Sequence, residues 1–157
     1  MSGIEIRRLA PDVVDPAVVL LRRVAEDPHG RFFTPHPFTR DGIAALAAAP
    51  GQDLYYLLLD AGGAVAYGLL RGWNAGYAIP SLGLAVAPDA RGMGYGSLMT
   101  SFLHVAARRQ GAVRVRLRVH HENTQAIRLY AARGYVFPEP PDRMTGLQVG
   151  FCDVAKS

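Results

Sequence analysis

A chain of 157 residues has the size of one domain and is long enough to bury a core without help from a metal ion or a disulfide. Half of its residues are hydrophobic and 19% are charged, a balance that excludes an intrinsically disordered chain. The net charge is +4, and every basic residue except Lys156 is arginine. A body without lysine excludes phosphate loops of the Gly-Lys type and Schiff-base enzymes.

The N-terminal half predicts a strand, two helices and a hairpin. Ile4 and Ile6 alternate with polar neighbours, as in a half-buried strand. Asp15 with Pro16 and, further on, Thr39 are typical first residues of helices. The expected elements are a strand over 3–9, helices over 15–27 and 39–49, and strands over 53–60 and 64–71 joined by a turn at 60–63.

The C-terminal half continues as a mixed α/β pattern. Ser81–Val86 is small and apolar throughout, which is typical of a central strand covered on both faces. Further along, Arg114, Arg116 and Arg118 alternate with valine and leucine and so share one face of a strand. The expected elements are helices over 97–110 and 123–133, a strand over 113–119 and a strand pair near 135–137 and 147–154. This order predicts one sheet in an α/β domain.

The turn between Ser81–Val86 and the next helix predicts an anion site. Gly92, Gly94 and Gly96 stand at alternate positions, so the backbone can take positive φ and approach a ligand closely. Their N–H groups would converge at the positive end of the helix, which suits a phosphate or pyrophosphate, and Arg91 adds a guanidinium. A dinucleotide-binding fingerprint is excluded because the third glycine comes one residue early. A glycine turn without a ligand is the alternative.

Two motifs resemble those of the GNAT superfamily of acyl-CoA N-acyltransferases. The stretch Arg91-Gly92-Met93-Gly94-Tyr95-Gly96 matches the family signature R/Q-x-x-G-x-G/A. Within 117–135, Asn123 precedes an alanine by three residues, and a Leu-Tyr pair and a Gly-aromatic pair follow, like the family's next motif. The element order fits as well, so the resemblance covers nearly the whole chain. It implies a single-domain GNAT fold over residues 1–157, with a mixed, mostly antiparallel twisted sheet flanked by helices and a V-shaped cofactor cleft between two central strands.

The resemblance also implies acetyl-CoA as the acyl donor, with direct transfer of its acetyl group to a primary amine in a ternary complex. The glycine turn would bind the CoA pyrophosphate, and the preceding strand would pair with the pantetheine arm. A backbone N–H near Leu84 or Ala85 would then polarise the thioester carbonyl. The expected cofactor-binding residues are Leu84, Ala85, Val86, Arg91, Gly92, Met93, Gly94, Gly96, Ser97, Asn123 and Tyr130.

Three residues are catalytic candidates. Tyr130 matches the tyrosine whose phenol would protonate the departing thiolate, or else it only packs on the inner face of its helix. Many relatives carry a glutamate base on the strand before the glycine turn, but Ser81–Val86 contains no carboxylate. Ser81 could relay a proton through water, and His36 has a suitable pKa for a base; the alternatives are an ordinary turn serine and a packed loop histidine. His120 and His121 should point in opposite directions on an extended chain, so we expect no metal site.

The acceptor is less well defined. Residues 34–38 and 71–81 flank the predicted cleft and resemble GNAT members that acetylate amino-sugar nucleotides. A sugar could stack on Trp73 or a phenylalanine, although such aromatics also serve as packing. We expect a small-molecule amine such as an amino sugar. A peptide or protein amine, an amino acid, a catalytically weak acyl-CoA sensor and a nucleic-acid-binding domain are the alternatives; the last is disfavoured because no aromatic stripe accompanies the arginines.

Cysteine usage and the termini predict the cellular context. Cys152 is the single cysteine, so we expect neither an intrachain disulfide nor a zinc cluster. The N-terminus lacks the apolar segment of a signal peptide, and no apolar run approaches ~18 residues. We therefore expect a cytoplasmic protein that binds neither a membrane nor nucleic acid. The apolar C-terminal strand would allow a homodimer.

Overall fold

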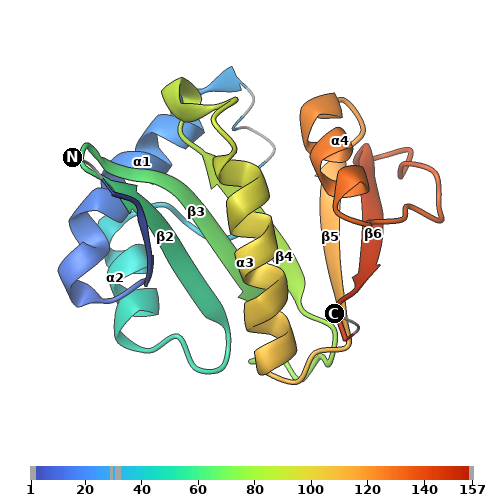
Figure 1. The fold of residues 1–157 in the computed structure, drawn as a ribbon, viewed down its shortest axis with the longest axis horizontal. Coiled ribbons are helices and arrows are strands. Elements are labelled where there is room, and N and C mark those ends of the chain that lie inside the picture. Colours follow the sequence, from blue (N-terminus) through green and yellow to red (C-terminus); the bar gives the residue numbers. More distant parts are fainter. Residues whose placement is uncertain (1–2, 29, 31–32, 156–157) are drawn as a thin grey trace.

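The computed structural model describes residues 3–28, 30 and 33–155. Six strands form one sheet in which their spatial order equals their order in the chain (Figure 1). Their bounds are β1 Glu5–Arg8, β2 Leu54–Asp60, β3 Gly63–Arg71, β4 Ser81–Val86, β5 Arg114–His120 and β6 Leu147–Asp153. Neighbouring strands are antiparallel except β4 and β5, which are parallel. The expected mixed, mostly antiparallel sheet is confirmed.

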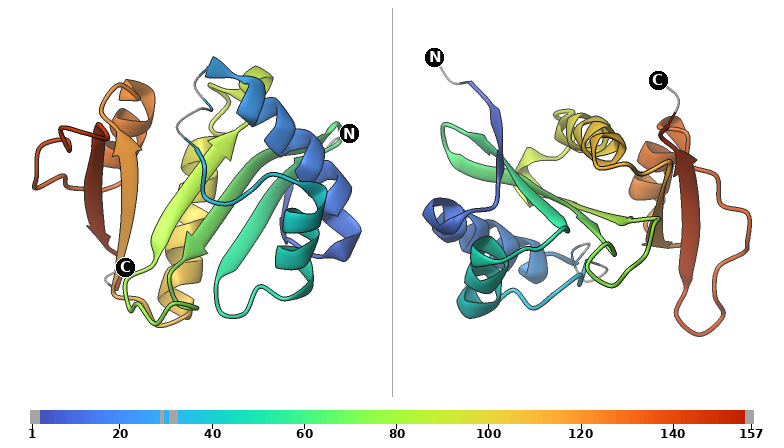
Figure 2. Two further views of the ribbon diagram at one scale, coloured as in Figure 1. Left: turned by 180° about the vertical axis from the view of Figure 1, so that it is seen from behind. Right: turned by 90° about the horizontal axis from the view of Figure 1, so that it is seen from below.

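Helices cover both faces of the sheet. The bounds are α1 Val14–Glu26, α2 Arg40–Ala48, α3 Tyr95–Arg109 and α4 Thr124–Ala132, with single 3-10 turns at η1 Pro11–Val13 and η3 Pro88–Ala90. Seen along the sheet, α1 and α2 lie on one face and α3 and α4 on the other (Figure 2). In the part of the chain described above, no helix is long and apolar enough to cross a lipid bilayer.

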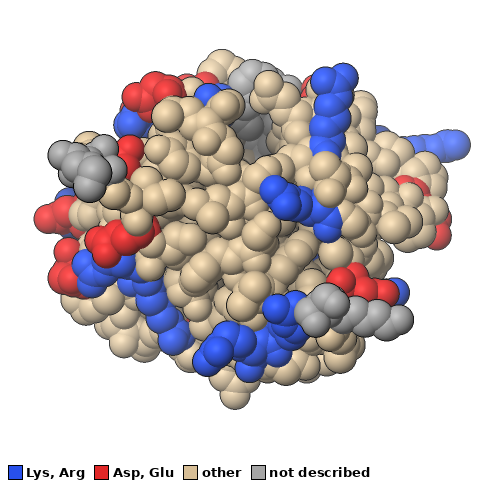
Figure 3. Space-filling model, viewed as in Figure 1, with Lys and Arg blue, Asp and Glu red and all other residues tan. Residues whose placement is uncertain are grey.

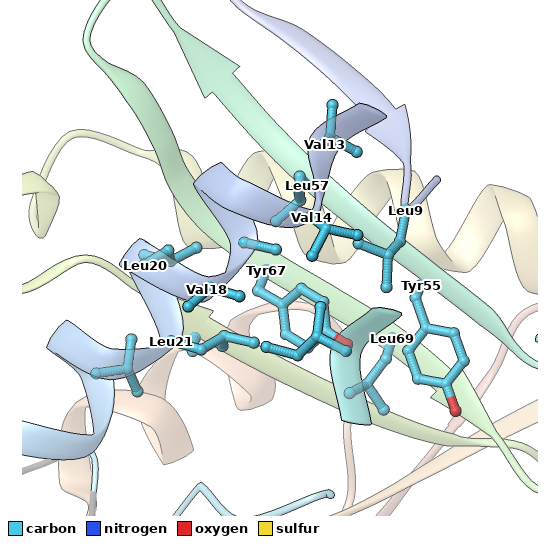
Figure 4. Packing of buried hydrophobic residues seen from close by; sticks show 14 of the residues in the cluster. Leu9, Val13, Val14, Val18, Leu20, Leu21, Tyr55, Leu57, Tyr67 and Leu69 are labelled. Carbon is cyan, nitrogen blue, oxygen red and sulfur yellow. The ribbon is translucent and has the colours of Figure 1, made fainter. Parts of the chain in front are cut away.

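Two apolar clusters fix these layers. Apolar residues three and four positions apart on α1 pack onto Leu57, Tyr67 and Leu69 of β2 and β3 (Figure 4). On the opposite face, α3 buries Met99 and Leu103 against the sheet. Gly68 permits this approach, because a Cβ there would lie 2.8 Å from Met99 Cγ and 2.9 Å from Leu103 Cδ1.

Several predicted element ends differ from the observed ones. The 3-10 turn η1 leads directly into α1, so the helix begins at Val14 and Asp15 lies inside its first turn instead of capping it. Thr39 does cap α2, since its Oγ1 accepts a hydrogen bond from the Gly42 N–H at 3.1 Å. The predicted last strand pair is reduced to β6 and one bridge between Val136 and Phe151. His29, Arg31 and Phe32 of the predicted helix end and aromatic loop, and Lys156, lie outside the described residues.

Candidate active site

β4 and β5 are held together at one end only. Their pairing consists of Ser81 opposite Arg116, with the Arg116 N–H donating to the Pro80 carbonyl at 2.9 Å. Beyond this point the two strands diverge in a V (Figure 1). A cavity of about 350 Å³, here called the donor cavity, lies in the opening between β4, the glycine turn, the first turn of α3 and α4. The molecular surface is hollowed beside the N-terminal end of α3 (Figure 3).

The free edge of β4 offers its main-chain groups to this cavity. Along a strand, the N–H and C=O groups of successive residues point alternately to the two sides. The Pro80 carbonyl is turned toward β5, whereas the Ala87 N–H donates to Val65 of the β3 side at 2.8 Å. The alternation therefore turns the main-chain groups of Leu84 and Val86 into the cleft, where β5 no longer pairs with them. Ala85 lines the cavity, but its main-chain groups face β3.

The glycines of the turn serve two purposes. Gly92 and Gly94 have φ values of +79° and +89°, and a Cβ on either would meet no atom within 4 Å. They are therefore needed for backbone conformation, as expected. Gly96 differs from the prediction because it lies within α3 and does not take a positive φ. A Cβ there would lie 3.2 Å from Leu129 Cδ2, so this glycine lets α3 and α4 approach each other across the cavity.

The N-terminus of α3 opens into the donor cavity with its backbone donors uncapped. The helix begins at Tyr95 after Gly94 in the left-handed conformation, no side chain among the described residues caps it, and its first turn contains no acidic residue. The first N–H groups of a helix have no partner within the helix, and the helix dipole adds positive charge there. Gly96 and Ser97 line the cavity at this end. These donors are suited to bind an anion.

Arg91 and Met93 flank the glycine turn in different ways. Arg91 lines the donor cavity, and its Nη2 donates to Asp27 Oδ2 at 2.9 Å, an ion pair that fixes the guanidinium at the rim. Met93 is 66% exposed and does not line the cavity. The Met93 side chain therefore points away from the cavity, and only its backbone N–H could contribute to ligand binding at the turn.

α4 contributes Asn123 and Tyr130 to the donor cavity. Asn123 caps the helix, because its Oδ1 accepts a hydrogen bond from the Ala126 N–H at 3.3 Å. The Tyr130 side chain is 6% exposed and packs edge-on against Tyr135 at 5.5 Å between ring centroids. Burial raises the pKa of the Tyr130 phenol above its ordinary value, so the hydroxyl stays protonated at neutral pH. The Tyr130 hydroxyl therefore carries the proton that a general acid would need.

A second cavity, of about 990 Å³, lies beside β4 on the face of the sheet that carries α1 and α2. We call it the acceptor cavity. Ser81, Arg71, Arg116 and Tyr55 line it. Five residues line both cavities, namely Phe33, Leu82, Gly83, Arg118 and His120. The two cavities therefore meet along the middle of β4, with Tyr130 on the donor side and Ser81 on the acceptor side.

His36 lies outside both cavities. Its Nδ1–H donates to the Pro37 carbonyl at 2.9 Å, so its Nε2 accepts the Tyr67 O–H at 2.8 Å. Rings of Phe38 and Tyr55 surround it. Burial is the main cause of a lowered His36 pKa, which favours the neutral ring. With both nitrogens engaged in an aromatic cluster, His36 has the geometry of the packing alternative.

The adjacent histidines also differ from the sequence expectation. β5 ends at His120, so the chain turns, and the rings of His120 and His121 stack at 4.7 Å between centroids instead of pointing apart. His120 reaches the junction of the two cavities, and its Nδ1 accepts the Glu122 N–H at 3.2 Å. Among the described residues, no group of three His, Cys, Asp or Glu side chains is arranged to hold a metal ion.

The sequence interpretation missed the arginines of the acceptor cavity. Arg116 and Arg118 were recognised as sharing one strand face, but nothing in the sequence showed that this face and Arg71 border a cavity. Trp73 was a candidate for stacking on a sugar. It packs instead against the apolar cluster beneath α3 and lines neither cavity. Phe33, by contrast, lines both cavities, where a sugar ring could stack on it.

The chain is similar to a known family in sequence and to solved structures in fold. Residues 20–135 match the model of the acetyltransferase (GNAT) family. Among solved structures, a GNAT-family acetyltransferase from Streptococcus pneumoniae is similar with a TM-score of 0.80 at 19% identity, covering 95% of this chain and 98% of that one. The PaiA N-acetyltransferase from Thermoplasma acidophilum in complex with coenzyme A gives 0.79 at 13% identity, covering 96% and 99%.

A third structure, YncA from Salmonella typhimurium with its cofactor acetyl-CoA, gives a TM-score of 0.77 at 17% identity and covers 98% of this chain and 95% of that one. At these identities the likeness concerns the fold. No protein with a curated description matches the sequence.

Proposed function

The chain belongs to the acetyltransferase (GNAT) family, and from this membership we propose how its cleft transfers an acetyl group from acetyl-CoA to a primary amine. The observation that carries the proposal is the divergence of β4 and β5 over an uncapped helix N-terminus. That arrangement supplies an unpaired strand edge and an anion site in one cavity. An acyl-CoA has a matching peptide-like arm and pyrophosphate.

The donor cavity fits acetyl-CoA in a defined direction. The first-turn N–H groups of α3, with those of Gly92 and Gly94, would bind the pyrophosphate. The main chain of Leu84 and Val86 would pair with the pantetheine arm in place of a neighbouring strand. This leaves the Leu84 N–H to hold the thioester oxygen, since the Ala85 N–H faces β3. Arg91 and Asn123 would flank the cofactor from the turn and from α4.

The reaction then proceeds by direct attack. The amine nitrogen approaches from the acceptor cavity and bonds to the thioester carbonyl carbon, while negative charge grows on the oxygen near the Leu84 N–H. The C–S bond breaks, and the Tyr130 hydroxyl donates its proton to the leaving sulfur. The raised pKa of Tyr130 favours return of a proton to the phenolate, which restores the hydroxyl.

The proton of the attacking amine leaves on the acceptor side. β4 provides no carboxylate there, and His36 is engaged elsewhere. Ser81 is the residue among the three catalytic candidates that lines the acceptor cavity, but it lies three residues along β4 from Leu84. We therefore assign the proton to water in the acceptor cavity, with Ser81 as a hydrogen-bond partner of that water and not as the group beside the amine. The size of this cavity supports a small-molecule acceptor, such as an amino sugar that stacks on Phe33.

Amine-dependent release of CoA from acetyl-CoA tests this function. The wild-type protein is assayed with amino sugars, amino acids, polyamines and peptides, and each product is checked by mass for one added acetyl group. We expect turnover with at least one class of small amine. Turnover with peptide N-termini alone would contradict a small-molecule acceptor. Binding of acetyl-CoA without turnover across the panel would instead support the acyl-CoA sensor.

A further inference from the structure

Three polar side chains form a row across the floor of the acceptor cavity. Ser81 of β4 is directly opposite Arg71 of β3 on one side and Arg116 of β5 on the other. Residues directly opposite each other in a sheet extend their side chains to the same face. All three line the acceptor cavity. A hydroxyl group is therefore flanked by two guanidinium groups. Arg118, two residues beyond Arg116 on β5, adds a third guanidinium group on the same face.

The arginines of this row form no ion pair within the described part of the protein. Arg114 on the same strand pairs with Asp153 at 3.1 Å, whereas no described carboxylate lies within ion-pair distance of Arg71, Arg116 or Arg118. The acceptor cavity does contain the carboxylate of Asp53. However, Asp53 is 5% exposed, and its Oδ1 accepts the backbone N–H groups of Gly72 and Asn74 at 3.0 and 3.2 Å.

The hydrogen-bonding capacity of the row is also incompletely used. Arg71 donates one N–H, from Nη1, to the Pro35 carbonyl, which orients its guanidinium at the cavity. The Nε atom of Arg116 is buried and has no hydrogen-bond partner among the described residues. A buried donor without a partner is costly, and such groups are usually satisfied by a ligand or by ordered water. Arg116 therefore marks a position where a polar ligand group is expected.

We propose that the Arg71–Ser81–Arg116 row binds an anionic group of the acceptor, so that the acceptor is an amine that also carries a carboxylate or a phosphate. The inference rests on the proposed function. Guanidinium forks match both anions by paired N–H donors, and the Ser81 hydroxyl adds a further donor between them. The same positive charge disfavours polyamines and other purely cationic acceptors.

The geometry of β4 also sets the spacing within the acceptor. The anion site is at Ser81, and the thioester oxygen is placed at the Leu84 N–H, three residues further along the strand. At a rise of about 3.3 Å per residue, these positions are about 10 Å apart. The amine and the anion of a good acceptor are therefore separated by several bonds, as in an amino-sugar phosphate or a long ω-amino acid, and not by one carbon as in an α-amino acid.

Matched amines test this specificity. Glucosamine 6-phosphate is compared with glucosamine, and 6-aminohexanoate with hexylamine and with glycine. We expect kcat/KM to be at least about 10-fold higher for the charged member of each pair, because charge-assisted hydrogen bonds are lost in the other. The two pairs distinguish phosphate from carboxylate, and glycine tests the spacing. Equal kcat/KM within both pairs, or preference for hexylamine, overturns the proposed anion site.

Arginine variants locate the effect. Arg116→Gln should raise KM for the preferred charged amine by about 10–100-fold and leave its neutral counterpart within twofold. Arg114→Gln is the matched control on the same strand, since its side chain is exposed and paired with Asp153. Arg116→Lys, which keeps the charge but not the fork, should be intermediate. Equal effects of Arg116→Gln and Arg114→Gln contradict the assignment.

Binding measurements separate this inference from the proposed function. Calorimetric titration of acetyl-CoA into each variant should give the wild-type affinity, because Arg116 does not line the donor cavity. Failure of the wild type to bind acetyl-CoA would contradict the proposed function alone. In that case the charged and neutral amines are titrated into the protein by themselves. Selective binding of the charged amines, lost in Arg116→Gln, would still support the anion site, and its absence would overturn it.

Discussion

Replacement of Tyr130 by phenylalanine should lower turnover by about 100-fold, with acetyl-CoA affinity within about twofold of the wild type. The phenol is the proton donor to the departing sulfur, and general acid groups contribute rate factors of about this size. The ring itself keeps its packing against Tyr135 in the variant. Pre-steady-state and steady-state release of CoA thiol, with calorimetric titration of acetyl-CoA, measure the two quantities separately.

Tyr135→Phe is the matched control. It also removes a largely buried phenol, whose oxygen lies 2.8 Å from His104 Nε2, but Tyr135 does not line the donor cavity. This variant should lose thermal stability and keep its turnover per folded molecule. Unchanged turnover in Tyr130→Phe would remove Tyr130 from the mechanism. Equal losses of turnover in the two variants would mean that removing either hydroxyl disturbs the structure, and would also contradict a catalytic role for Tyr130.

Introduction of a carboxylate at Ser97 should weaken acetyl-CoA binding by about 100-fold while stabilising the protein. Ser97 lies in the first turn of α3 and lines the donor cavity, where we place the pyrophosphate. In Ser97→Asp, a negative charge would stabilise the helix N-terminus but repel the phosphates, and like-charge contacts cost several kcal/mol. Each 1.4 kcal/mol is a tenfold change in affinity. Thermal unfolding and acetyl-CoA titration would thus change in opposite directions.

Ser101→Asp controls for the added charge. Ser101 lies one turn further along α3, is exposed and does not line the cavity. The long-range effect of one extra carboxylate on a polyanionic ligand is screened at physiological ionic strength. Its acetyl-CoA affinity should therefore stay within about threefold of the wild type. If Ser97→Asp bound acetyl-CoA as well as Ser101→Asp does, the pyrophosphate could not lie at the α3 N-terminus.

Features encoded locally were predictable from the sequence. Gly92 and Gly94 permit the positive φ that other residues rarely adopt, and the alternation in β5 follows from the side-chain period of a strand. Tyr130, which we selected through its motif, lines the donor cavity, and its catalytic role stays a prediction. The start of α3 was predicted two residues late because its cap is the backbone conformation of Gly94, which leaves no side-chain signal in the sequence.

Features that depend on distant segments were not predictable. The row of Arg71, Ser81 and Arg116 exists because three strands pair in one register. No local sequence pattern indicates that Ser81 pairs with Arg116, or that β4 and β5 pair at this position only. The environment of His36 is set by Tyr67, which lies 31 residues away in the sequence. The packing role of Gly96 likewise depends on Leu129 of another helix.

Titration of the protein with acetyl-CoA tests most directly that the opening between β4 and β5 is an acyl-CoA site. Saturable binding is expected, and acetyl-CoA at 100 times its Kd should stabilise the folded state by about 2.7 kcal/mol in thermal unfolding. Binding should be weaker in Ser97→Asp and unchanged in Arg116→Gln. The absence of any binding or thermal shift with acetyl-CoA and with longer acyl-CoAs would contradict this assignment of the cleft.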